Sequence, residues 1–149
     1  MKNIIWKKPN GELAITTIVN PDIDEKEESQ KLMLDQNHIG YEVIGYNVNI
    51  PKEMHSRDFR KSWDLVDGAL VVNLAKAKEE KIAEIRTKRN NALSSLDISY
   101  MKALEKNDTS LMQKIALQKQ ALRDLPSNLD LSSIKSVSDL KSLNPKEIE

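Results

Sequence analysis

The longest amphipathic stretch of the chain covers residues 73–126. Apolar residues recur at helical spacing over 82–104, with charged residues filling the positions between them. A polar break at 106–108 follows, and a second amphipathic run then covers 111–125. Two amphipathic helices joined by a short polar segment can bury their apolar faces against each other, so the pattern predicts a helical hairpin.

Several residues in this stretch suit helix ends. Asn73 is a natural N-cap for the first helix, and either Asp108 or Thr109 can cap the second. The Ser-Ser-Leu-Asp segment at 94–97 is a weak point, because Ser and Asp side chains compete for backbone hydrogen bonds. We therefore expect either one bent helix or two, the second recapped at the end of this segment. Pro126 is expected to end the hairpin.

Upstream, the hydrophobic pattern has the short period of β-structure. Residues 2–7 and 12–19 are rich in β-branched residues and flank a Lys-Pro-Asn-Gly turn, which predicts a β-hairpin. A short helix is expected over 25–36, since its first turn is acidic and complements the helix dipole. A third strand is expected within 41–50. The change of phase at Gly45 indicates a β-bulge there.

A second β-hairpin is predicted around Asp67-Gly68, a pair suited to a two-residue turn. Its strands would come from 59–66 and 69–73. With this turn, apolar residues face one another on one side of the hairpin. The predicted pairs are Trp63 with Val72 and Leu65 with Leu70.

These elements indicate an α+β fold: a small antiparallel sheet of β-hairpins with one short helix, followed by a C-terminal helical hairpin. The sequence divides into a β-rich module (1–72), the helical hairpin (73–126) and a Ser-rich C-terminal segment (127–149). In the last segment a short helix is expected after Ser136.

Composition narrows the function further. The 149 residues carry no net formal charge, so no surplus of Lys and Arg indicates nucleic-acid or anionic-membrane binding. The absence of cysteine excludes disulfides and thiolate chemistry. The N-terminus has no long apolar run, and no window is apolar enough for a membrane-spanning helix. We therefore expect a protein that is made and kept in a cytoplasm, unless an assembly carries it out.

Candidate catalytic and metal-binding residues are few. His38 and His55 are the only histidines, and neither has an acidic residue at a spacing typical of metal ligands. The four glycines are far apart, so no phosphate-binding loop is expected. The acidic residues at 22–28 lack the spacing of a calcium-binding loop and suit the solvated start of a helix. We expect no enzyme, no cofactor and no metal.

One arginine stands out because it interrupts the apolar side of the first long helix. Arg89 is four residues from both Ile85 and Leu93. A buried guanidinium needs a carboxylate partner, and folding the chain about Asn107 places Arg89 opposite Asp124. We therefore predict an Arg89–Asp124 ion pair. The other basic residues of 86–89 alternate with glutamates, as on an exposed face of salt bridges.

The helical region also has more apolar residues than one seam between two helices needs. We expect the surplus to bind a partner or to pack on the Ser-rich segment. The scarcity of aromatic residues, with a single Phe, favours a small core and leaves self-association into a homo-oligomer open. The surplus residues are Met101, Leu104, Met112, Leu117 and Leu129, and the first four are the candidate partner-binding residues.

From Arg57 to Pro145 the chain resembles a family of small tailed-bacteriophage proteins related to the phage tail assembly chaperones. Its helical part is similar to the Arg-x-x-Arg, Leu-Asp and Leu-Arg-Asp-Pro pattern of tail and tail-fibre assembly proteins. The matching segments are RDFRKSWDL (57–65), VVNLAKAKE (71–79), IRTKRNNALSSLD (85–97), ISYMKALEKND (98–108), KQALRDLP (119–126) and the closing SVSDLKSLNP.

The resemblance implies a non-enzymatic helper of virion assembly that binds a phage tail or tail-fibre protein in the host cytoplasm. The alternative is a structural virion component, such as an adaptor subunit of the tail or fibre. The resemblance supplies no catalytic residue. The residues on its motifs, which we expect to be structural, are Arg86, Arg89, Asp97, Arg123 and Asp124, together with Trp63 of the β-hairpin.

Overall fold

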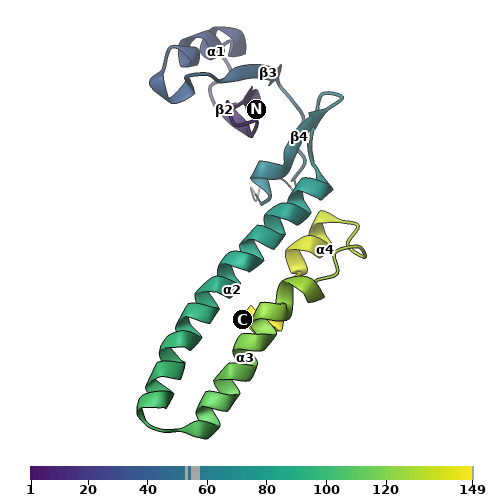
Figure 1. The fold of residues 1–149 in the computed structure, drawn as a ribbon. Helices are drawn as coiled ribbons and strands as arrows, with labels where there is room; N and C mark the ends of the chain where they lie inside the picture. The colour runs from purple at the N-terminus through teal and green to yellow at the C-terminus, as the bar shows by residue number, and fades with distance from the viewer. Residues whose placement is uncertain (53, 55–57, 149) are drawn as a thin grey trace. The chain divides into compact units, whose positions relative to one another are not determined.

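The computed structural model describes residues 1–52, 54 and 58–148, and its fold is α+β, as the sequence predicted (Figure 1). The chain divides into two compact units, Met1–Ala77 and Lys78–Glu149. The division falls inside the long helix α2 (Leu74–Glu105). The strands described all belong to the first unit, and the helical hairpin belongs almost entirely to the second.

The first unit is built on a three-stranded antiparallel sheet of order β2-β1-β3. Its strands are β1 (Lys2–Lys7), β2 (Leu13–Ile18) and β3 (Glu42–Tyr46). The turn between β1 and β2 closes with a 2.8 Å hydrogen bond from the Gly11 N–H to the Lys8 carbonyl, with Gly11 at a φ of +84°. The predicted first hairpin and third strand are therefore confirmed.

The central strand β1 is covered on both faces, which explains the consecutive apolar residues Ile4, Ile5 and Trp6 at its centre. Ile4 and Trp6 point to the face that packs with residues of helix α1 (Glu25–Met33), whereas Ile5 points to a second core on the opposite face. Asp24 caps α1 by accepting hydrogen bonds from the Lys26 and Glu27 N–H groups. The acidic cluster is thus a capped helix start.

Helix α1 is shorter than the predicted 25–36. It ends at Met33, and a separate 3₁₀ turn (Gln36–His38) follows. Asp35 begins this turn, because its carboxylate accepts a hydrogen bond from the Asn37 N–H and its backbone is extended. A short polar side chain that caps a new turn stops the preceding helix from continuing.

The predicted bulge in β3 is present. Ile5 pairs with Gly45 and Trp6 pairs with Val43, so Ile44 is an extra residue in β3. A Cβ atom on Gly45 would lie 2.8 Å from a methyl group of Val48. Glycine is therefore needed there because the chain returns closely against the sheet.

Strands β4 (Trp63–Val66) and β5 (Ala69–Val72) form the second hairpin, with Trp63 opposite Val72 and Leu65 opposite Leu70 as predicted. Asp67 and Gly68 both have positive φ, as a type I′ turn requires. The first strand does not extend back to residue 59. Phe59 has a φ of +52° and begins a 3₁₀ turn, so the chain is not extended before Trp63.

The second unit contains the rest of α2, then α3 (Thr109–Asn128) and α4 (Val137–Ser142). Helix α2 is continuous through 94–97. Ser94 and Ser95 donate to the carbonyls four residues earlier, so their hydroxyls are satisfied without breaking the helix. As predicted, Asn73 caps α2 through a 3.2 Å bond from the Lys76 N–H. The short helix expected after Ser136 is also present as α4, and Ser136 is its cap.

Pro126 does not end the hairpin, contrary to the prediction. It lies inside α3, which continues to Asn128. A proline removes one N–H that would bond to the carbonyl four residues earlier. In the last turn that loss is a single hydrogen bond, and the helix continues for two residues beyond it.

Candidate functional site

The turn of the hairpin fixes how α2 meets α3. Asn107 has a φ of +56°, and its N–H donates to the Leu104 carbonyl while the Asp108 N–H donates to the Ala103 carbonyl. This pair of bonds is a Schellman motif, which satisfies the last carbonyls of α2. Asp108 then caps α3 through a 2.9 Å bond from the Leu111 N–H. Two local motifs thus reverse the chain within three residues.

Buried residues mark the side on which each helix packs within the second unit. The buried apolar residues are Ile85 and Ala103 in α2 and Ile115, Leu122 and Leu125 in α3. The two helices run side by side in Figure 1. The C-terminal segment contributes the buried Ile134 and Leu140. Its loop is also bonded to α2, through a 2.7 Å hydrogen bond from Lys78 Nζ to the Leu131 carbonyl.

An ion pair joins the two helices on one side of the hairpin. Lys119 of α3 pairs with Asp97 of α2, and the Lys119 ammonium lies over the Tyr100 ring, 5.5 Å from its centroid. Lys119 is only 17% exposed, whereas Asp97 is 60% exposed. Asp97 was expected to be structural from the family motif. Lys119 was missed, because a lysine in a mixed amphipathic helix gives no signal of its partner.

This ion pair places the candidate partner-binding residues relative to one another. Leu104 follows Asp97 by seven residues and Met112 precedes Lys119 by seven. Seven residues are close to two full helical turns, so Leu104 and Met112 lie on the same side of the hairpin as the ion pair, toward the turn. Met101 is four residues beyond Asp97, about 40° around α2 from it, but it lies farther from α3 because it is two residues from the buried Ala103. We call Met101, Leu104 and Met112 the tip patch.

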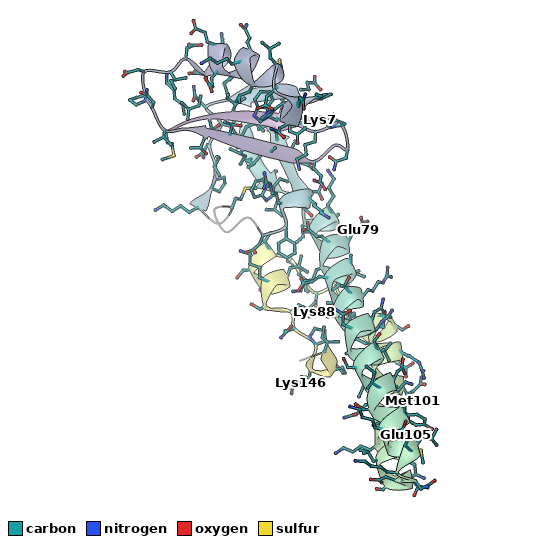
Figure 2. The ribbon with its side chains drawn as sticks, turned by 90° about the vertical axis from the view of Figure 1, so that its left-hand side faces the viewer. Lys7, Glu79, Lys88, Met101, Glu105 and Lys146 are labelled. Carbon is teal, nitrogen blue, oxygen red and sulfur yellow. The ribbon has the colours of Figure 1, made fainter. Side chains whose placement is uncertain are left out.

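The tip patch is accessible. Met101 is 55% exposed and Leu104 is 47% exposed, and Met112 is half-buried. Figure 2 shows Met101 and Glu105 on the last turns of α2, toward the hairpin turn. Methionine adapts its shape to irregular partners better than other apolar residues, which favours a binding role over a fixed core role.

Leu117 does not belong to the tip patch. It is two residues from Lys119, which places it about 160° around α3 from that side chain. At 74% exposed it is the most exposed apolar residue of the hairpin among those described. Two more exposed apolar residues, Ile98 and Leu111, were not selected from the sequence. Ile98 could have been selected, because its helical position places it away from the buried side of α2. Leu111 could not, because it is four residues from the buried Ile115 and so lies on the packing side of α3. Leu129 is half-buried.

The predicted Arg89–Asp124 pair is absent from the structure. Arg89 bonds instead to the neighbouring Asn90 Oδ1, at 3.0 Å from Nη2, and Asp124 accepts a 2.9 Å bond from Gln120. Asp124 and Arg123 are exposed, as is Arg86. Equal separation from the turn aligns residues along two helices, but it does not set the direction in which each side chain points. Of the motif residues, only Asp97 forms an ion pair between the helices.

One exposed and one buried lysine of α2 form salt bridges with Glu84. Glu84 pairs with Lys88 at 2.8 Å and with Lys81 at 3.2 Å. Hydrogen bonding from Lys88 opposes the smaller effect of burial and lowers the pKa of the Glu84 carboxyl, with Lys81 contributing further. Glu84 and the two lysines thus form compensated ion pairs.

Of the two histidines, the structure describes His38. His38 packs with aromatic rings, its centroid 5.1 Å from that of Trp6 and 5.2 Å from that of Tyr41. His55 lies outside the described residues. Among those residues, no three His, Asp or Glu side chains are grouped to hold a metal ion.

No helix in the described chain combines the length and apolar character needed to cross a membrane. Family models, curated proteins and solved structures contain no match to this chain.

Proposed function

We propose that the protein is a non-enzymatic helper in the assembly of a bacteriophage tail or tail fibre, and that it acts by binding a tail or tail-fibre protein. The observation that carries this proposal is the tip patch, an exposed apolar surface beside the Asp97–Lys119 ion pair. The resemblance of residues 57–145 to tail assembly chaperones supplies the identity of the partner.

The chemistry of the tip patch suits a protein partner. Exposed apolar side chains grouped on one surface lose contact with water when another protein covers them, which favours binding. The neighbouring charges of Asp97 and Lys119 would form a polar rim around that contact. A partner segment with apolar residues on one face of a helix would fit this arrangement.

Co-expression tests the proposal. The protein would be expressed with each tail and tail-fibre protein of the same phage, and the soluble yield of each would be measured. We expect the yield of one of them to rise. The M101S/L104S double variant should abolish the gain, because it removes two apolar contacts of the tip patch.

Leu117→Ser is the matched control, since Leu117 is at least as exposed but lies away from the patch. It should leave the gain intact. Circular dichroism and thermal melting of each variant would verify that it is folded. If M101S/L104S and L117S act alike, the tip patch is not the binding surface.

The alternative function is a structural virion component, an adaptor subunit of the tail or fibre. Mass spectrometry of purified particles distinguishes the two functions. An assembly helper should be absent from finished particles, whereas a subunit should be present at a fixed copy number. Analytical ultracentrifugation of the protein alone would show whether the tip patch instead drives formation of a homo-oligomer.

A further inference from the structure

The first unit contains a cavity of about 660 Å³ that the proposed function does not use. It lies on the face of the three-stranded sheet opposite α1, where Asn3 and Ile15 of the sheet meet the segment around Ile50 and the hairpin residue Trp63. Its volume is within the roughly 300–1,000 Å³ range of small-ligand pockets.

The cavity combines an apolar lining with positive charge. Ile15, Ile50, Met54 and Trp63 supply the apolar part, and Lys2 and Arg60 line it as well. None of the described lining residues is acidic. Lys2 is already engaged, since its Nζ lies 3.4 Å from Glu25 and donates to the Ile23 carbonyl at 2.9 Å. The charge of Arg60 has no carboxylate partner among the described residues.

Two nitrogen donors beside the cavity lack hydrogen bonds. Arg60 Nε and Trp63 Nε1 are both buried, and neither has a partner in the described part of the chain. Trp63 is 97% buried, so water cannot compensate for the missing bond. Buried donors are almost always satisfied in proteins, and each one left unpaired costs on the order of 1–3 kcal/mol. Both residues that line the cavity at this point thus carry a covered donor with no acceptor among the described residues.

We propose that this cavity binds a carboxylate carried beside an apolar group, with Arg60 as the counter-ion. Arginine matches a carboxylate through two parallel N–H donors, so it favours this anion over a simple point charge. The apolar group would lie against Met54 and Trp63. Because Arg60 Nε is covered in the unbound protein, the side chain would turn toward the incoming anion. A peptide carboxyl terminus and an acidic side chain both offer this chemistry.

Three small probes test the proposal on the full-length protein. N-acetyl-leucine carries both the carboxylate and the apolar side chain, N-acetyl-leucinamide lacks the charge, and acetate lacks the side chain. Binding would be followed by NMR, through the Trp63 indole N–H and Asn3 side-chain resonances. N-acetyl-leucine should saturate these shifts. N-acetyl-leucinamide should bind about tenfold more weakly because it loses one charged hydrogen-bonded contact, and acetate should bind about tenfold more weakly or worse because it loses the burial of the leucine side chain.

Two variants locate the anion contact. Arg60→Gln should weaken N-acetyl-leucine binding by about tenfold. Lys61→Gln is the matched control, because Lys61 is the adjacent cation, is exposed and does not line the cavity, and it should leave binding unchanged. Unchanged spectra of distant residues would show that both variants are folded.

A comparison of N-acetyl-leucine with N-acetyl-aspartate amide and with a peptide ending in leucine distinguishes a carboxyl terminus from an acidic side chain. The proposal is overturned if N-acetyl-leucinamide binds as well as the acid, if Arg60→Gln and Lys61→Gln have equal effects, or if no probe shifts the Trp63 resonance. None of these outcomes bears on the tip patch, which belongs to the other unit.

Discussion

Lys119 of α3 forms an ion pair with Asp97 of α2 and lies 5.5 Å from the centroid of the Tyr100 ring. This ion pair connects the two helices of the hairpin. By helical spacing, Leu104 and Met112 lie on the side of this pair, two turns closer to the hairpin turn.

A double-mutant cycle with Asp97→Ala and Lys119→Met measures the strength of this pair by urea denaturation. We expect a coupling of about 0.5–1 kcal/mol, because Asp97 is largely exposed and solvent screens its charge. The control is the same cycle with Lys88→Met in place of Lys119→Met. The changes in the free energy of unfolding should be additive in that cycle, because Lys88 pairs with Glu84 and not with Asp97. Additivity in both cycles would show that the pair does not stabilise the hairpin.

Arg89 has no carboxylate partner across the hairpin, so its replacement should be tolerated. Arg89→Met is expected to change the free energy of unfolding by no more than about 0.5 kcal/mol, as is usual for surface substitutions. The double variant with Asp124→Leu should show additive changes in the same measurement. A loss of several kcal/mol that the second change recovers would instead establish the Arg89–Asp124 pair.

Trp63 and Trp6 are both buried, but only Trp6 has a hydrogen-bonded indole, through a 2.9 Å bond from Nε1 to Thr16 Oγ1. Trp63→Ala should destabilise the protein by roughly 3–5 kcal/mol, because it opens a cavity in the core. Trp63→Phe should cost less than Trp6→Phe by about 1 kcal/mol, since it removes no hydrogen bond. Guanidinium denaturation of the three variants would measure these differences.

The Asn3 side chain replaces a missing stretch of strand pairing. Its Nδ2 donates to the Val48 carbonyl and its Oδ1 accepts from the Val48 N–H, both at 2.9 Å. Asn3→Leu should cost about 2 kcal/mol or more, because it leaves two buried backbone groups unpaired. Asn49→Leu is the control at an exposed position and should be close to neutral. Equal effects would mean that the Asn3 bonds do not contribute to stability.

Asp64 links the second β-hairpin to the start of α2 and makes stability depend on pH. Hydrogen bonds from Lys76, at 2.7 Å, and from Asn73, at 2.8 Å, lower the pKa of its carboxyl below the ordinary value of 3.8. A group with a lowered folded pKa stabilises the protein above its unfolded pKa, and this contribution is lost as the pH falls through the folded pKa.

We therefore expect a loss of stability below about pH 4 that Asp64→Asn reduces, measured by denaturation between pH 2 and 6. Lys76→Met should reduce the same loss, since it removes the largest cause of the shift. Identical pH profiles for the wild type and Asp64→Asn would show that this carboxylate does not contribute.

Much of the local structure follows from short stretches of sequence. Asp67-Gly68 predicted a hairpin and its register because few residues adopt the two positive φ angles of that turn. Asn73, the pair Asp108-Thr109 and the segment after Ser136 indicated where three helices begin. In the structure the Asn73, Asp108 and Ser136 side chains each accept from an N–H three residues away. Such preferences act within a few residues and need no distant partner.

Other local signals were overridden. The segment 94–97 did not break α2 and Pro126 did not end α3, because packing along the helices outweighs the loss of one or two local hydrogen bonds. Conversely, Phe59 left the predicted strand, since its positive φ is incompatible with extended pairing.

The sequence by itself determined the two β-hairpins, the capped helices and the reversal at Asn107, and it selected the apolar residues that exceed the needs of the core. Only the tertiary structure decided which of these residues share a surface. It also decided that Lys119, and not Arg123 or Arg89, forms an ion pair across the hairpin. Finally, it placed Arg60 and Trp63 in the lining of one cavity. The physical reason is that these relationships depend on how far each element is rotated about its own axis. The summed packing of all the buried side chains sets that rotation, and no single segment of the chain encodes it.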